Sequence, residues 1–247
     1  MRAAGAACAT AVATCSAVVV VSSAMAAPAV QTMVVGAGGV VLSAPRTVTA
    51  SSTSVRVGSR SCAVAAGTPL AALAGLERLG GPAFSLRDYG RCGSSASSSG
   101  QLFVYRLGGE SNRGQDGWEY KVDRISGTTG AGDTSGARGN GRLLSSGQHV
   151  LWFWCAASAG GCQRTLEVSA APSVTRGATL AVQVEGYDNE GRGRPVAGAI
   201  VTLGSDFAST DSAGRARLIA PRGRGSYSLS AKRGGLVPSF PETIVVR

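Results

Sequence analysis

The chain has 247 residues and a formal net charge of +10 at pH 7, from 24 Lys and Arg against 14 Asp and Glu. Basic residues are spread along the chain and form no clusters interleaved with aromatics, so we expect no nucleic acid partner. A positive surface favours anionic partners such as wall polymers. The 36 glycines, with aromatic residues at only 5%, favour many turns and short strands over long helices.

Residues 1–26 have the order of a secretory signal peptide. One charge, Arg2, precedes an Ala/Val-rich stretch with four valines at 18–21, and small residues lead up to Ala26. We expect cleavage between Ala26 and Ala27. A membrane anchor is the weaker alternative, because the apolar run is too short to cross about 30 Å of hydrocarbon. The mature chain is therefore predicted to be secreted and extracellular, without an integral membrane segment, and any association with a cell wall would come from binding.

Four of the six cysteines lie beyond the predicted signal peptide: Cys62, Cys92, Cys155 and Cys162. An even count in an exported protein predicts two disulfides. Of the three possible pairings we favour Cys62–Cys92 and Cys155–Cys162, because these close short loops. A four-cysteine zinc site would need close pairs with two to four residues between ligands, and these are absent. We expect no metal and no cofactor.

The first elements in chain order are strands. Residues 27–53 contain two apolar pieces on either side of a glycine-rich turn at 36–39, which predicts a β-hairpin. Val55 and Val57 then alternate with polar residues and predict a strand that leads to Cys62.

A helix follows. Thr68 can serve as its N-cap, and Pro69 suits the first helical position. Glycines at 80–81 end it. The helix is the only one predicted, and its leucines are expected on one face: Leu70, Leu73, Leu76 and Leu79.

The rest of this part of the chain predicts further strands, at 102–107, 118–122 and 150–155. The last of these is apolar on both faces and should be central in its sheet. Residues 126–141, rich in Gly, Thr and Ser, predict a long surface loop that is either functional or flexible. Two strands, one helix and further strands give the β-grasp arrangement, a mixed sheet with one helix laid across it.

Three segments in this part also carry a family pattern: 68–73, 117–123 and 144–152. On these segments residues 31–155 resemble the uncharacterised β-grasp domains that are similar to the C-terminal half of cobalamin carriers such as intrinsic factor and transcobalamin. The family usually has Asn-Gly where this sequence has Asp123-Arg124, and an acidic residue where it has Gln148. The resemblance implies a β-grasp fold with altered turns.

Residues 164–247 predict a second unit. Six strand-like segments with turn signals between them indicate a β-sandwich: 165–168, 180–184, 199–203, 216–219, 227–231 and 243–246. Asp211 and Gly214 suit a tight turn between paired strands. From the segments 195–201, 210–216 and 225–229, this unit resembles carboxypeptidase-regulatory-like, prealbumin-type sandwich modules. The resemblance implies a structural module without peptidase activity.

Residues for catalysis are few. The one histidine, His149, lies beside the Trp-rich strand, and no Gly-x-Ser-x-Gly segment occurs, so we interpret His149 as a strand residue. The segment 188–191 departs from the spacing of an EF-hand calcium loop, and a polar turn is the preferred interpretation. A hydrolase using two carboxylates needs no histidine and stays a third hypothesis.

The most suggestive group is aromatic and comprises Trp118, Tyr120, Trp152 and Trp154. If their strands are neighbours, these side chains could share one face and bind a sugar ring or another flat ligand. Packing in the core is the competing interpretation, because a small sheet with one helix needs large side chains there.

These patterns predict a mainly β protein in two units, a β-grasp domain at 27–163 holding both disulfides and a β-sandwich domain at 164–247. We expect a monomeric, secreted, non-enzymatic binding module. Its β-grasp unit would recognise a glycan, a wall polymer or a small planar ligand. The alternative is a structural or adhesive surface protein whose partner is another protein.

Overall fold

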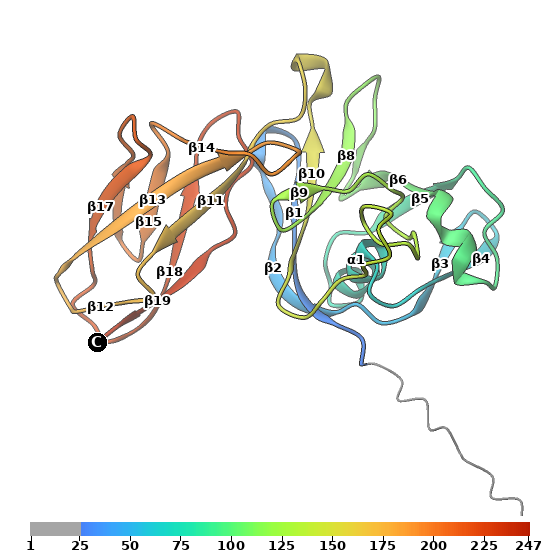
Figure 1. Ribbon diagram of the computed structural model, residues 1–247, viewed down its shortest axis with the longest axis horizontal. Helices are drawn as coiled ribbons and strands as arrows, with labels where there is room; N and C mark the ends of the chain where they lie inside the picture. Colours follow the sequence, from blue (N-terminus) through green and yellow to red (C-terminus); the bar gives the residue numbers. More distant parts are fainter. Residues whose placement is uncertain (1–25) are drawn as a thin grey trace, which may run out of the picture.

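The computed structural model describes residues 26–247, so all of the predicted signal peptide except Ala26 lies outside the described residues. The protein is mainly β, with a single α-helix and nineteen strands in the described part. Figure 1 shows two units side by side, the N-terminal one in blue to yellow and the C-terminal one in orange to red. Each unit has its own hydrophobic core. The residues of one core all precede the predicted boundary at 163–164, and those of the other all follow it.

A five-stranded sheet of order β2-β1-β10-β8-β9 organises the first unit. Strands β1 and β10 are parallel, and the other neighbours are antiparallel. The β1–β2 hairpin and the central position of β10, between β1 and β8, are confirmed. The strand bounds are Ala29–Val35 (β1), Val41–Thr49 (β2), Gly117–Val122 (β8), Ile125–Ser126 (β9) and His149–Cys155 (β10).

The predicted helix is confirmed as α1, Pro69–Arg78. The backbone N–H of Ala71 donates to the Thr68 hydroxyl at 3.2 Å, which caps the first turn. Leu70, Leu73 and Leu76 are fully buried, as expected. Leu79 was wrongly placed with them, because it is the C-cap residue, where the helical face ends, and it is 51% exposed.

Two smaller sheets complete the first unit. Strands β3 (Thr53–Val57) and β4 (Arg60–Val64) form a hairpin, and β5 (Phe84–Asp88), β6 (Leu102–Leu107) and β7 (Glu110–Ser111) form a three-stranded sheet. The strand predicted at 102–107 is therefore present as β6, but it lies outside the main sheet, because it pairs with β5 and β7.

Both predicted disulfides are confirmed. Cys62–Cys92 joins β4 to the segment after β5, and Cys155–Cys162 closes a short loop after β10. That loop contains the 3-10 turn Ala157–Ala159.

The predicted long loop is irregular but well anchored. Leu70 N donates to the carbonyl of Ala131 at 2.8 Å, and the Tyr120 hydroxyl donates to the carbonyl of Thr129 at 2.9 Å. Ala131 is buried beside the helix. The loop thus covers one end of the first core, because its backbone satisfies buried donors from α1 and β8.

The second unit is a β-sandwich. One sheet has β13 at its centre, paired with β11, β14 and β17, and the other has the order β12-β19-β18-β15-β16. All six predicted segments are strands, and the short strands β12, β14 and β16 were not predicted. Bounds are Thr165–Ala170 (β11), Ser173–Val174 (β12), Thr179–Tyr187 (β13), Gly193–Pro195 (β14), Ile200–Leu203 (β15), Asp206–Ser209 (β16), Arg215–Ile219 (β17), Gly225–Lys232 (β18) and Glu242–Val246 (β19).

The turn predicted at 211–214 has the expected chemistry. The Asp211 carboxylate accepts hydrogen bonds from the backbone N–H groups of Ala213 and Arg215, both at 2.9 Å. Gly214 has φ +74°, in the left-handed region that favours glycine.

A third hydrophobic cluster joins the units. Residues of β1 and β10 that face away from α1 pack with Val237, and Phe240 lies against them. The first-unit members are Met33, Val35, Leu151, Phe153 and Cys155. The main sheet is therefore covered by α1 on one face and, in part, by the second unit on the other.

No helix in residues 26–247 is both long and apolar enough to span a bilayer.

Candidate functional site

The four aromatic residues proposed as ligand contacts do share one face, but that face is the core. Trp118, Tyr120, Trp152 and Trp154 are between 2% and 6% exposed and pack in the same cluster as the α1 leucines. The rings of Trp118 and Trp154 meet edge to face at 5.8 Å between centroids. These four rings therefore belong to the core, as the competing interpretation expects, and Trp118 also lines a surface groove.

The positions at which the chain departs from the family pattern contact one another. Asp123 adopts φ +53° in the turn between β8 and β9. Its carboxylate accepts from Gln148 Nε2 and from the backbone N–H of His149, both at 2.9 Å. Short polar side chains tolerate this backbone region, so Asp123 can replace the asparagine that the pattern expects.

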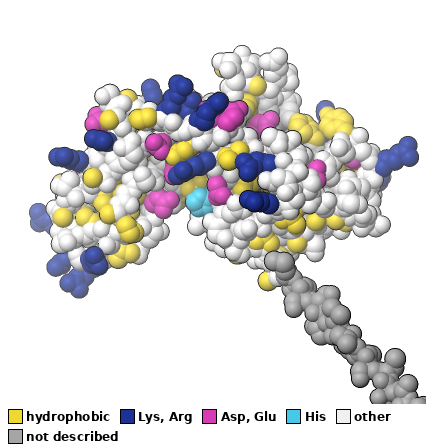
Figure 2. Space-filling view, viewed as in Figure 1, with side chains coloured by type: hydrophobic (Ala, Val, Ile, Leu, Met, Phe, Trp, Pro, Cys, Tyr) yellow, Lys and Arg dark blue, Asp and Glu magenta, His cyan; other side chains and the backbone are white. Residues whose placement is uncertain are grey.

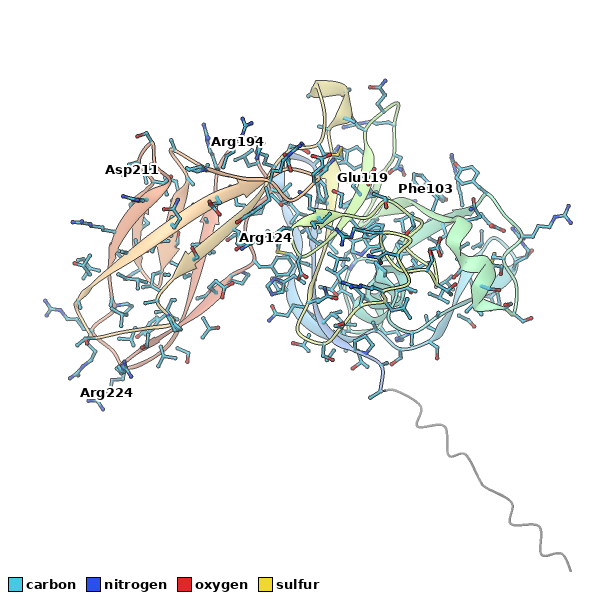
Figure 3. All side chains as sticks on the ribbon, in the orientation of Figure 1. Phe103, Glu119, Arg124, Arg194, Asp211 and Arg224 are labelled. Atoms are coloured by element: carbon cyan, nitrogen blue, oxygen red, sulfur yellow. A yellow bond between two sulfur atoms is a disulfide. The ribbon has the colours of Figure 1, made fainter. Side chains whose placement is uncertain are left out.

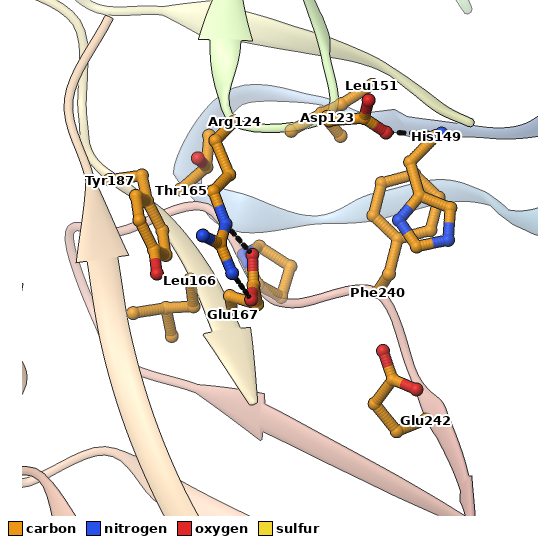
Figure 4. A pocket seen from close by; sticks show the side chains of 11 residues that line it. Asp123, Arg124, His149, Leu151, Thr165, Leu166, Glu167, Tyr187, Phe240 and Glu242 are labelled. Atoms are coloured by element: carbon orange, nitrogen blue, oxygen red, sulfur yellow. Dashed lines mark hydrogen bonds and ion pairs between the residues drawn. The ribbon is translucent and has the colours of Figure 1, made fainter. Parts of the chain in front are cut away.

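His149 is a strand residue of β10, as expected, and lies where the two units meet. Its ring stacks on Phe240 of the second unit, with 4.3 Å between centroids and an interplanar angle of 7° (Figure 4). The stacked pair lines a cavity of about 260 Å³ between the units.

An ion pair lines the other side of this cavity. Arg124 donates to both carboxylate oxygens of Glu167, with 2.7 Å between Nε and Oε2, and its guanidinium lies over the Tyr187 ring at 4.5 Å (Figure 4). The pair joins the β8–β9 turn to β11. These polar groups are engaged in joining the units, and we interpret the cavity as part of the junction.

The Asp188 turn is a polar turn with its own counter-ion. The Asp188 carboxylate accepts from the backbone N–H groups of Glu190 and Arg192, and the Arg192 side chain pairs with it at 2.9 Å. The hydrogen bond from the Arg192 backbone, above all, lowers the pKa of Asp188 to about 2. Over the part of the chain that the structure describes, no three His, Cys, Asp or Glu side chains gather as a metal site requires.

A different aromatic pair is exposed. Tyr89 is 66% exposed and Phe103 is 40% exposed, and their ring centroids lie 6.0 Å apart. Phe103 is on β6 and Tyr89 directly follows β5, so local strand pairing brings them together. Figure 2 shows a hydrophobic patch on this side of the first unit, and Figure 3 labels Phe103 there.

Beside this pair lies a groove of about 430 Å³, here called the aromatic groove. It is defined by Arg87, Tyr89, Phe103, Arg113, Trp118 and Glu119. Arg87 lies over the ring of Tyr105 at 4.8 Å, and Arg113 lies 5.6 Å from the Trp154 ring centroid. Neither arginine forms an ion pair with a residue in the described range 26–247.

The acids of the groove differ in their environment. The backbone N–H of Ser158 donates to Asp116, which lowers the pKa of that carboxyl. Desolvation of its carboxyl group raises the pKa of Glu119, although the residue as a whole is exposed to solvent. The groove therefore offers two rings, two cationic guanidinium groups and two carboxylates that can accept hydrogen bonds, a set suited to a polyhydroxylated ligand with a flat apolar face.

The sequence carries only a weak signal for this groove. Residues 102–107 alternate, so Leu102 and Val104 point inward, whereas Phe103 points outward. A single outward aromatic is common at protein surfaces, and Phe103 becomes a candidate binding residue because the ring of Tyr89 lies beside it. Tyr89 gave no such signal, because it lies after the strand and is placed only by the β5–β6 pairing.

No family model matches the chain, and neither does any curated protein or solved structure.

Proposed function

We propose that the protein is a secreted, non-enzymatic binding module whose first unit recognises a glycan through the aromatic groove. The observation that carries this proposal is the exposed Tyr89–Phe103 pair, which borders a groove containing Arg87 and Arg113, two arginines that form no ion pair within residues 26–247. Aromatic faces supply apolar contact area to sugar rings, and the polar groups around them fix orientation.

The proposal assigns the first unit to the β-grasp domains and the second to the prealbumin-type modules that it resembles. The order β2-β1-β10-β8 with β1 and β10 parallel, and a helix in the connection between β2 and β8, supports the first assignment. The two-sheet packing of residues 164–247 supports the second. In this proposal the sandwich acts as a spacer, and the two disulfides fit an extracellular location.

A binding role is preferred to catalysis by His149 or Glu167 because both side chains have structural partners, and of the two acids of the aromatic groove Asp116 accepts a hydrogen bond from the backbone of Ser158. His149 stacks on Phe240, and Glu167 pairs with Arg124. A catalytic acid and base need to converge on one reacting atom in a cleft, and these groups instead hold the two units together.

The test is glycan binding by the Tyr89→Ala/Phe103→Ala variant. We expect an array of neutral and acidic oligosaccharides to reveal a ligand, and calorimetry to show affinity about fivefold weaker for each ring removed, on the basis of about 1 kcal/mol per aromatic contact. Phe207→Ala is the matched control, since Phe207 is 70% exposed but lies on β16 of the sandwich.

Unchanged glycan affinity in the double variant would contradict the proposal. Cobalamin and a panel of protein partners should be assayed in parallel. Binding of cobalamin alone would point to the corrinoid resemblance, and binding of a protein alone would point to the adhesive alternative.

A further inference from the structure

The aromatic groove is one end of a longer depression. A neighbouring pocket shares Glu119 and Cys162 with it, and a third pocket shares Ile125 and Arg138 with the second. We call these three the β8–β9 trough. In Figure 3, Phe103, Glu119 and Arg124 follow one another across the same face of the molecule in this order.

We infer that the ligand is an extended oligosaccharide whose sugar ring stacks on Tyr89 and Phe103 and whose acidic substituent binds Arg138 and Arg142 at the far end of the trough. This inference rests on the proposed function and names the ligand class for the same site.

The far end is a pocket of about 310 Å³ that holds unpaired positive charge. Arg138 and Arg142 both line it and are exposed, and neither forms an ion pair with any residue between 26 and 247. Arg124 also lines it, but its guanidinium is bound to Glu167. Val122 and Leu144 give the pocket an apolar wall. Beside such a wall, water screens the attraction between a guanidinium group and an anion less than it does at an open surface.

The loop that carries these arginines is held in place before any ligand binds. The Thr129 hydroxyl donates to the Gly136 carbonyl at 2.8 Å, and Gly141 N donates to the Ser135 carbonyl at 2.7 Å. The Asn140 side chain accepts from Arg142 N at 3.2 Å. A pre-ordered loop reduces the entropy lost on binding, and a guanidinium group can form a bidentate contact with a carboxylate or a sulfate ester.

The middle of the trough carries both signs of charge and so does not favour a ligand with negative charge on every unit. Arg138, Glu119 and Glu190 line it, and Glu190 is paired with Arg192 whereas Glu119 forms no ion pair within residues 26–247. Carboxylates accept hydrogen bonds from sugar hydroxyls but repel anions. Nucleic acid and lipid headgroup surfaces would bring phosphates past Glu119, whereas a neutral stretch of glycan with one acidic unit would not.

The length of the trough indicates a chain of several sugar units. Gly117, the first residue of β8, lines the aromatic groove, and Val122, its last residue, lines the arginine pocket, so the length of β8 measures the separation of the two ends. Five residue steps at about 3.4 Å per residue make this distance about 17 Å. A monosaccharide that fills one end therefore cannot reach the other.

The test uses β-linked oligosaccharides of increasing length that carry one terminal uronic acid, and the same oligosaccharides with that acid reduced to an alcohol. For the unmodified protein we expect the acidic form to bind about tenfold to a hundredfold more tightly than the reduced form, and only above a threshold length. Arg138→Ala/Arg142→Ala should bind the acidic and the reduced forms with similar affinity, so that the preference for the acidic form and its salt dependence are both lost. Arg222→Ala/Arg224→Ala removes the same charge from the far end of the sandwich, where Figure 3 labels Arg224, and should keep the preference.

The outcomes separate the two proposals. If the unmodified protein binds both forms equally, or short acidic forms as well as long ones, the inference is wrong and glycan binding stands. If Arg138→Ala/Arg142→Ala keeps the acidic preference, the inference is also wrong. If no oligosaccharide binds, or if Tyr89→Ala/Phe103→Ala binds the reduced form normally, the proposed function itself fails.

Discussion

Lys121 on β8 is a cation in the junction between the two units. Its side chain is fully buried, and Nζ donates to the carbonyls of Tyr187 and Asp188 at 3.0 and 2.8 Å and to the Thr165 hydroxyl at 3.2 Å. The alternation of residues 118–122 places Lys121 on the face opposite the core aromatics. The sandwich covers that face, so the Lys121 side chain is buried between the two units.

The Lys121 amine is buried and has no carboxylate at ion-pair distance among the described residues. This environment makes the free energy of unfolding depend on pH. Removal from water disfavours the charged amine and lowers the pKa of Lys121 to about 8 from its usual 10.5. Between these two pH values the unfolded chain binds a proton that the folded chain lacks, so the free energy of unfolding should rise as pH increases from about 8 to about 10. The gain is bounded at about 3 kcal/mol.

We therefore expect Lys121→Met to differ from the unmodified protein in its pH dependence. Methionine has a similar length but no titrating group, so its unfolding free energy should lack the rise above pH 8. Urea unfolding of both proteins is measured at intervals from about pH 7 to pH 10. The difference between their free energies of unfolding reports on Lys121, because the contributions of the other titrating groups cancel. Parallel curves would show that Lys121 keeps an ordinary pKa in the folded state.

At the scale of helices and strands, sequence patterns predicted the elements whose formation depends on nearby residues. Helix α1 was found from its capping residues and leucine spacing, and β10 from its unbroken apolar run. The partner of β6 was not found, because β5 and β6 are separated in the chain and their pairing depends on the segment closed by Cys62–Cys92. The aromatic groove was missed for the same reason, since Tyr89 and Phe103 meet only through that pairing.

The long loop at 126–141 shows how an irregular element can be tightly packed. A Cβ on Gly130 would lie 1.9 Å from the carbonyl oxygen of Gly100, closer than atoms can approach. Gly127 has the same problem against the ring of Tyr120, at 2.0 Å. These contacts explain why a segment that reads as flexible instead covers the core.

Gly130→Ala should consequently destabilise the protein by about 1–3 kcal/mol, the range for overpacking a close contact. It should also weaken binding of the acidic oligosaccharide, because the loop that carries Arg138 must move. Gly93→Ala is the control, since nothing lies within 4 Å of a Cβ built there. Chemical denaturation of both variants provides the measurement, and equal midpoints for the two would show that the loop yields without cost.

At the scale of the whole molecule, the two units are joined by apolar packing as well as by polar contacts. Val237 is 3% exposed and packs with β1 and β10 of the first unit rather than with the sandwich core. Ser126 N donates to the Asn189 carbonyl at 2.9 Å at the same junction, and Arg124 pairs with Glu167. Val237 is a member of neither unit's own core. Its packing therefore stabilises the contact between the units.

This arrangement predicts that the units unfold together and that one substitution can separate them. Val237→Asp puts an unpaired carboxylate into the third cluster, at a cost of several kcal/mol, while the backbone bonds of Val237 to Arg164 and Leu166 within the second unit can persist. Calorimetry should show one transition for the unmodified protein and two for the variant. Phe207→Asp, at an exposed site of the sandwich, should leave a single transition. A single transition in Val237→Asp, close to that of the unmodified protein, would mean that the polar contacts alone couple the units.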